Sequence, residues 1–184
     1  VEAGDDKMRD SARFHFGFTV PYVTHQDVSS VIKAVQNAAG DLGIFSFSKK
    51  AASPWWLGLD APDAPKIIAR LPFVERPDHP AGTPVFVISK PLADAAVRET
   101  VIFHCETEDW NDAVGQTLSQ QGLLIETEFH HADQRRSFLL SGAGSYNVNS
   151  VSDLFTSHQI KLSSIHEIGS HAARFQLLSQ NKAG

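Results

Sequence analysis

The first half of the chain contains one run of apolar residues at helical spacing and several shorter runs of strand length. The helical run begins after Asp27, a suitable capping residue, and stops at Gly40; its apolar positions are Val28, Val31, Ile32, Val35 and Ala39. Strand-like runs follow at residues 40–47 (GDLGIFSF), 65–75 (PKIIARLPFVE) and 83–90 (TPVFVISK). A helix that leads into a strand, with further apolar strands behind it, predicts an α/β sheet.

The second half alternates strands and helices in a regular order. We expect its first helix to begin at Asp109, with Asp112 in the first turn, and to end at Gly122, and its second to be capped by Asn149 or Ser150. The strands that surround these helices are predicted at residues 100–106, 123–129, 136–140 and 160–168, with a last apolar run at 174–178. The order β-α-β-β-α-β predicts a ferredoxin-like sandwich in which two helices cover one face of one sheet.

Proline usage divides the chain. All nine prolines lie between Pro21 and Pro91, and none follows. Because proline interrupts regular elements, we expect two modules, an α/β segment over residues 1–91 and the ferredoxin-like unit over residues 92–184.

Composition narrows the class of protein. The chain is 42% hydrophobic and 20% charged with a net charge of −5, which fits a globular protein without a basic nucleic-acid-binding surface. No apolar run is long enough for a membrane span, and the single cysteine, Cys105, fits a reducing compartment, so we predict a cytoplasmic protein. The start at Val1 suggests a fragment with a domain upstream.

Nine histidines raise the question of a metal site. His166 and Glu167 with His171 partly match the zinc-protease pattern, but that pattern needs two histidines four residues apart on a helix. Here the spacing is five and the surroundings are strand-like, so the two imidazoles are expected on opposite faces. We predict no metal site and no cofactor.

Two further short motifs have structural interpretations. His104 and Cys105 are neighbours in a strand and face opposite ways, which indicates a buried thiol rather than a nucleophile with its base. The run GAGSYN at residues 142–147 lacks the third glycine of a dinucleotide fingerprint, which indicates a turn.

The pair Trp55 and Trp56 lies close in sequence to Ser46, Ser48 and Lys49, at the end of a predicted strand. These residues are candidates for the mouth and wall of a ligand pocket; alternatively, the tryptophans close the edge of the sheet and the hydroxyls close a turn. Positive charge for a carboxylated ligand is available from Arg13, Lys66 and Arg70.

Two long stretches carry a family resemblance. The sequences MRDSARFHFGFTVPYV (8–23) and APKIIARLPFVERPDHPAGTPVFVIS (64–89) resemble the C-terminal region of proteobacterial proteins of the chorismate mutase type. In those proteins an all-helical mutase domain comes first. The resemblance implies that an upstream helical domain is a partner of this chain and that mutase activity would belong to that domain.

The first half also resembles a shortened prephenate dehydratase. GDLGIFSFSKKA is similar to a dehydratase segment that ends a strand at a substrate-facing turn, and GTPVFVIS lies where that family has its Thr-Arg-Phe motif. Thr83 matches the threonine and Phe86 the phenylalanine, whereas Pro84 and Val85 stand between them in place of the arginine. The resemblance makes Thr83 the candidate catalytic residue if a dehydratase-like reaction survives.

The second half is similar to an ACT regulatory domain. NDAVG (111–115) lies where ACT domains place a ligand-binding turn, and IETEF (125–129) takes the place of their second motif. The resemblance implies a site for an aromatic amino acid, or a prephenate-like small molecule, formed by Asn111, Asp112 and Glu126.

Taken together, these features predict the accessory or regulatory region of a chorismate mutase-type protein of aromatic amino-acid biosynthesis. We expect it to bind an aromatic ligand or to mediate homodimerisation. The alternatives are a prephenate dehydratase-like enzyme with a degenerate motif and a purely structural dimerisation module.

Overall fold

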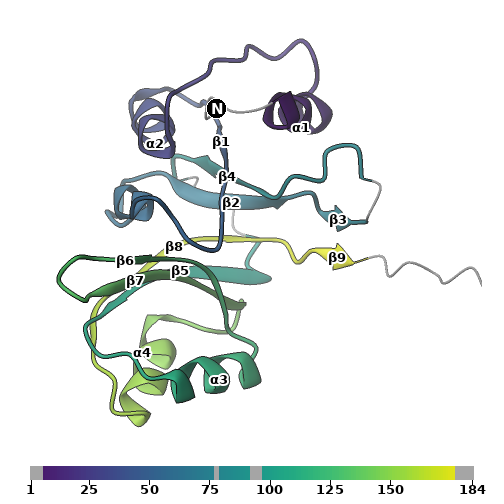
Figure 1. Cartoon of the computed structure of the whole chain (residues 1–184). Helices are drawn as coiled ribbons and strands as arrows, with labels where there is room; N and C mark the ends of the chain where they lie inside the picture. Colours follow the sequence, from purple (N-terminus) through teal and green to yellow (C-terminus); the bar gives the residue numbers. More distant parts are fainter. Residues whose placement is uncertain (1–5, 77–78, 92–96, 177–184) are drawn as a thin grey trace, which may run out of the picture.

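The computed structural model describes residues 6–76, 79–91 and 97–176. They form a mixed α/β structure in which four α-helices surround one curled, mixed seven-stranded sheet (Figure 1). A separate pair of two-residue strands, β3 (Val74–Glu75) and β9 (Phe175–Gln176), extends from its side.

In the first half, three predicted strands are confirmed, while one α-helix and the short 3₁₀ helix were not predicted. The unpredicted helix is α1 (Asp6–Phe16). Helix α2 (Val28–Asn37) begins where the sequence indicated, because the Asp27 side chain accepts a hydrogen bond from the Ser30 N–H at 2.7 Å. The remaining elements are β1 (Gly43–Ser46), the 3₁₀ helix η1 (Trp55–Leu59), β2 (Lys66–Leu71) and β4 (Val85–Ser89).

In the second half, the predicted order β-α-β-β-α-β is present. Its elements are β5 (Thr100–Thr107), α3 (Asp112–Gln120), β6 (Leu124–His130), β7 (Arg136–Ala143), α4 (Val148–Ser157) and β8 (Leu162–His171). Both predicted helix starts were wrong, the first by two residues and the second by two or three. Asn111 caps α3 in place of Asp109, and Asn147 caps α4 in a reciprocal capping box with Ser150.

The strand order is β1-β4-β2-β8-β5-β7-β6. Neighbouring strands are antiparallel except β2 and β8, which run parallel and join the two halves where Ile67 pairs with Gly169. Beyond β1 the chain reaches β6, the strand at the other end of the sheet. There the Ala51 N–H donates to the Glu128 carbonyl (2.9 Å), and the Glu128 N–H donates to the Lys49 carbonyl (3.1 Å). The sheet therefore curls until its two edges nearly meet.

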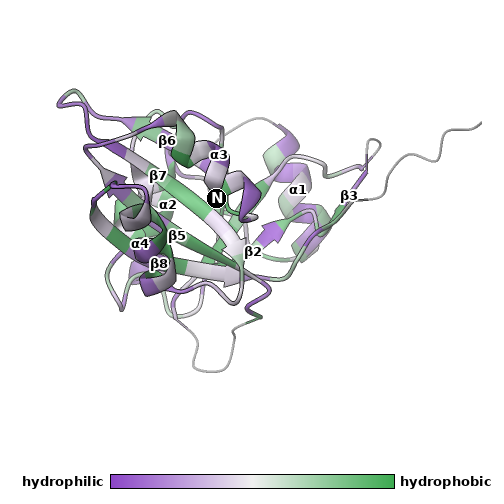
Figure 2. Ribbon diagram, turned by 90° about the horizontal axis from the view of Figure 1, so that it is seen from below, coloured by the Kyte–Doolittle hydropathy of each residue, from purple (hydrophilic) through white to green (hydrophobic). Residues whose placement is uncertain are grey.

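Side chains of the sheet alternate between the inside of the curl, where Val31, Ile32 and Val35 of α2 also pack, and its outer faces. The inner core contains Phe45, Trp56, Phe86, Ile102, Leu139 and Ile168. The outer faces pack separately, with α1 against β1, β2 and β4, and α3 and α4 against β5 and β7. Hydrophobic segments accordingly lie along the central strands in Figure 2. Both halves of the sequence contribute to the inner core, and the division near Pro91 remains a prediction.

No helix in the described part of the chain is both long and apolar enough to cross a membrane.

Candidate functional site

The tryptophan pair lies in the inner core. Trp55 and Trp56 are 7% and 0% exposed, and the ring of Trp55 meets that of Phe45 edge-on at 4.8 Å. Trp56 donates its indole N–H to the Ser137 hydroxyl at 2.7 Å. Both rings thus belong to the inner core inside the curl, not to the edge of the sheet, and Trp55 also lines a cavity beside α2.

Next to Trp56 is a chain of polar side chains that sequence reasoning missed. His104 Nδ1 lies 2.9 Å from a carboxylate oxygen of Asp60, and its Nε2 lies 3.0 Å from the Ser137 hydroxyl. Since a carboxylate only accepts hydrogen bonds, Nδ1 carries the proton and Ser137 donates to Nε2. The order Asp, His, Ser has the geometry of a hydrolase triad.

Burial argues against catalysis by this triad-like chain. His104 and Ser137 are both fully buried, and Trp56 already donates to the serine oxygen. A substrate has no route to a serine oxygen with no exposed surface. The chain therefore serves to anchor η1 to strands β5 and β7 through satisfied buried hydrogen bonds.

The segment GDLGIFSF and the residues after it have two different roles. Ser48 donates its hydroxyl to the Lys50 carbonyl at 2.6 Å and so closes a turn, whereas Ser46 ends strand β1. Lys49 extends to β6, where its ammonium donates to the Ile125 carbonyl at 3.0 Å. Of these three candidates, Lys49 is the one brought to a cavity.

That cavity, which we call the β6 cavity, lies beside strand β6 and has a volume of about 460 Å³. Its apolar wall consists of Leu118, Leu123, Leu124 and Ile125, with Gly115 and Ser119 from the adjoining face of α3. Its charged residues come from five separate segments and are Lys49, Arg70, Glu75, Glu126 and Arg174.

Arg70 and Glu126 form the most buried ion pair of the cavity. Their nearest atoms are 2.5 Å apart, and the two side chains are 18% and 5% exposed. Glu126 also accepts from the Ser141 hydroxyl at 2.6 Å, and the Arg70 guanidinium lies 5.1 Å from the ring centre of Phe47. Arg70 Nε is buried without a hydrogen-bond partner among the described residues, so one donor of this guanidinium is unused.

Arg174 adds a second guanidinium. It pairs with Glu75 and donates from Nε to the Pro72 carbonyl at 3.1 Å. Burial, followed by the charge of Arg70, lowers the pKa of Arg174 to about 10. The lining therefore has three cationic side chains and two carboxylates, an excess of one positive charge in a chain of net charge −5.

His171 is a further polar residue close to this charged group. It is 2% exposed, its Nδ1 donates to the Ala172 carbonyl at 2.7 Å, and its Nε2 has no partner in the described structure. Burial is the main cause that lowers the pKa of His171, and the positive charge of Arg70 acts in the same direction. The neutral imidazole therefore keeps an acceptor lone pair on Nε2.

Among the described side chains, Asn111 and Thr83 do not belong to the lining of the β6 cavity. Asn111 accepts a hydrogen bond from the Ala113 N–H at 2.8 Å, which accounts for it as a helix cap. Thr83 lies in the turn before β4, and the described lining does not include it. The side chain of Asp112 lies outside the described residues. The structure thus brings together Lys49, Glu126 and Arg70 from the sequence candidates and adds Arg174, for which the sequence contained no signal.

Cys105 has the buried position that the sequence indicated. Cys105 is fully buried on the helix side of β5, opposite His104, and burial raises the pKa of its thiol. Among the described residues, no group of three or more His, Cys, Asp or Glu side chains is arranged to hold a metal ion.

No protein-family model matches the chain, and neither the curated proteins nor the solved structures searched contain a match.

Proposed function

We propose that this chain is the small-molecule-binding, regulatory region of a chorismate mutase-type protein and that its ligand is a carboxylate held in the β6 cavity. The observation that carries the ligand part of the proposal is the excess positive charge of Lys49, Arg70 and Arg174 beside an apolar wall. The chorismate mutase-type part rests on the sequence resemblance of residues 8–23 and 64–89. A ligand with an aromatic or other apolar body and a carboxylate matches both parts. An aromatic amino acid and a prephenate-like acid both meet this description.

The architecture around the cavity supports an ACT-like module. Strands β8-β5-β7-β6 are antiparallel neighbours, and α3 and α4 pack on one face of them, as in a ferredoxin-like sandwich. The cavity adjoins β6, which contains the IETEF segment that resembles the second ACT motif. The upstream helical domain and a homodimer belong to the same proposal.

The enzyme alternative receives less support. A dehydratase-like reaction needs Thr83 next to a carboxylate-binding arginine. Thr83 is separate from the β6 cavity, in which the arginines converge.

The test is calorimetric titration of the chain with phenylalanine, tyrosine and prephenate, combined with thermal unfolding. A ligand that binds only the native state raises the melting temperature. We expect one of the three ligands to bind. Lys49→Met should lower the affinity for that ligand about tenfold, because a charge-assisted contact is lost.

A matched pair of variants locates the site. Ser119→Phe introduces bulk at the cavity and should abolish binding, whereas Gln116→Phe, at an exposed position of the same helix outside the lining, should not. If none of the three ligands binds at millimolar concentration, the proposal fails, and sedimentation would then test whether the chain only dimerises.

A further inference from the structure

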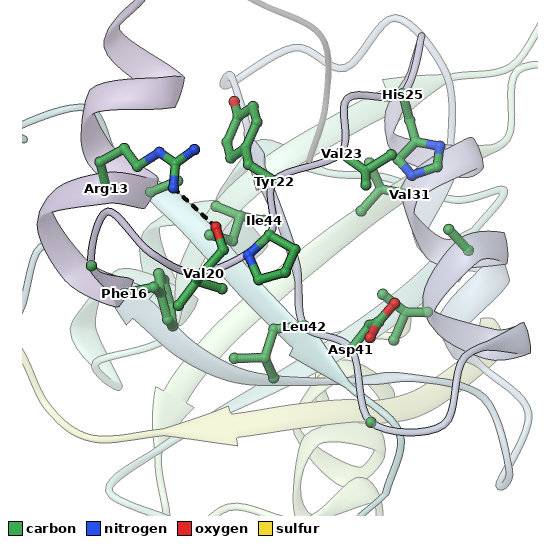
Figure 3. A pocket seen from close by; sticks show the side chains of 16 residues that line it. Arg13, Phe16, Val20, Tyr22, Val23, His25, Val31, Asp41, Leu42 and Ile44 are labelled. Atoms are coloured by element: carbon green, nitrogen blue, oxygen red, sulfur yellow. Dashed lines mark hydrogen bonds between the residues drawn. The ribbon is translucent and has the colours of Figure 1, made fainter.

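A different cavity lies at the β1 edge of the sheet, between helices α1 and α2 (Figure 3). We call it the α1–α2 cavity. Its volume is about 440 Å³, within the range of small-molecule sites. Its walls come from the two helices, the start of β1 and the connecting segments at residues 17–25 and 40–42. Among the described residues, none lines both this cavity and the β6 cavity.

Most of the wall is apolar. The residues that form it include Phe16, Val20, Val31, Val35, Leu42 and Ile44. Three apolar lining residues remain partly in water: Val20, Val23 and Leu42 are 48%, 64% and 43% exposed. When a ligand covers apolar side chains around a concave site and removes them from water, the free energy of binding becomes more favourable.

One side of the cavity carries a guanidinium that is held in place. Arg13 Nη1 donates to the carbonyls of Phe18 (2.5 Å) and Val20 (2.9 Å), and the guanidinium carbon lies 5.4 Å from the ring centre of Tyr22. Both hydrogen bonds use Nη1. The parallel N–H groups of Nε and Nη2 form the edge that fits the two oxygens of a carboxylate.

The opposite side carries a negative charge. Figure 3 shows Arg13 and Tyr22 at one end of the cavity and Asp41 with His25 at the other. The Asp41 carboxylate repels a second acidic group on a ligand, so the cavity selects against dicarboxylates. A ligand with one acidic group would place it at Arg13 and its apolar body against β1 and α2.

We propose that the α1–α2 cavity is a binding site for an apolar monocarboxylate, such as a medium-chain fatty acid. This site is independent of the one at β6, and either can fail without the other. Its affinity comes from covering Val20, Val23 and Leu42, which are exposed to water in the free chain, and its preference for an acid comes from Arg13.

Calorimetry with decanoate and with the uncharged 1-decanol separates these two contributions. We expect saturable one-site binding, with decanoate about tenfold tighter than 1-decanol. Arg13→Met should lower the affinity for decanoate about tenfold. The affinity for 1-decanol should change by less than about threefold, because only the acid uses the guanidinium. Equal loss for both ligands would overturn the role of Arg13 in recognition.

Location is tested on α2. Ala34 lines the cavity, so Ala34→Phe should fill it and lower the affinity for both ligands at least about tenfold. Ala34→Leu should have an intermediate effect on both affinities. Asn37→Phe adds the same bulk at an exposed position outside the lining and should leave both affinities unchanged. Absence of saturable decanoate binding by the unaltered chain at one millimolar, or unchanged affinity in a folded Ala34 variant, would overturn the site.

Discussion

Ile67 and Gly169 are the register pair through which the two halves of the chain join into one sheet. Gly169 has φ +153°, and a Cβ on it would lie 2.2 Å from the Ile67 carbonyl oxygen and 2.6 Å from the Ile67 nitrogen. Only a residue without a side chain permits this approach of β8 to β2.

Gly169→Ala should therefore lower the free energy of unfolding by about 2 kcal/mol or more, since it adds backbone strain to a clash with main-chain atoms. Urea unfolding followed by tryptophan fluorescence measures the change. Gly115→Ala is the control: there a Cβ meets only Trp110, at 3.7 Å, and alanine favours the helix by up to about 1 kcal/mol. Equal stability of the two variants would contradict the close approach.

Ser137→Ala removes the middle of the buried chain from Trp56 to His104. It leaves the indole N–H and the imidazole Nε2 without partners, and we expect a loss of about 1–3 kcal/mol in unfolding free energy. Ser163→Ala, at an exposed position of β8, should change stability by less than about 0.5 kcal/mol. Because Ser137 is fully buried, a serine-directed fluorophosphonate should not label the native chain; rapid labelling would reopen the hydrolase interpretation.

His171 makes stability depend on pH. Its pKa in the folded chain lies below the ordinary 6.5, so the unfolded chain takes up the proton first as the pH falls. The stabilisation is complete above pH 6.5 and is lost as the pH falls from there towards the folded pKa. His171→Gln should reduce this slope of unfolding free energy against pH. The substitution should not abolish the slope, because burial also lowers the pKa of His15. An unchanged slope would contradict the assignment.

Cys105 should react slowly with a thiol reagent in the native chain. The thiol is fully buried, and burial raises its pKa, so little thiolate is available. We expect labelling by an aromatic disulfide to be roughly 100-fold faster in denaturant than in buffer. Similar rates in both solutions would contradict the packing of β5.

Asn111 tests the helix cap against a ligand role. Asn111→Ala should lower the unfolding free energy by about 0.5–2 kcal/mol, whereas Asn111→Asp keeps an acceptor for the Ala113 N–H and should be nearly neutral. If Asn111 acts as a cap alone, both variants keep the ligand affinity of the β6 cavity, which calorimetry can measure. Loss of affinity in both variants would show that Asn111 takes part in ligand binding.

Local patterns in the sequence were sufficient to predict most elements. The Asp27 cap, the apolar spacing of α2 and the alternation of β5 involve residues a few positions apart, where the chain itself fixes the distances. The same locality explains the errors at the starts of α3 and α4. Several residues there can cap a helix, as Asp109 and Asn111 can, and only the backbone path determines which side chain accepts the hydrogen bond.

The arrangement of the sites required the tertiary structure. Asp60 and His104 are 44 residues apart, and Arg70 and Glu126 are 56 apart, yet each pair is in direct contact. No local spacing relates such residues, because their distance depends on which strands pair, in what register, and how far the sheet curls. Pattern and capping chemistry determined the elements, while burial of the shared inner core and the bare backbone at Gly169 decided which of them meet.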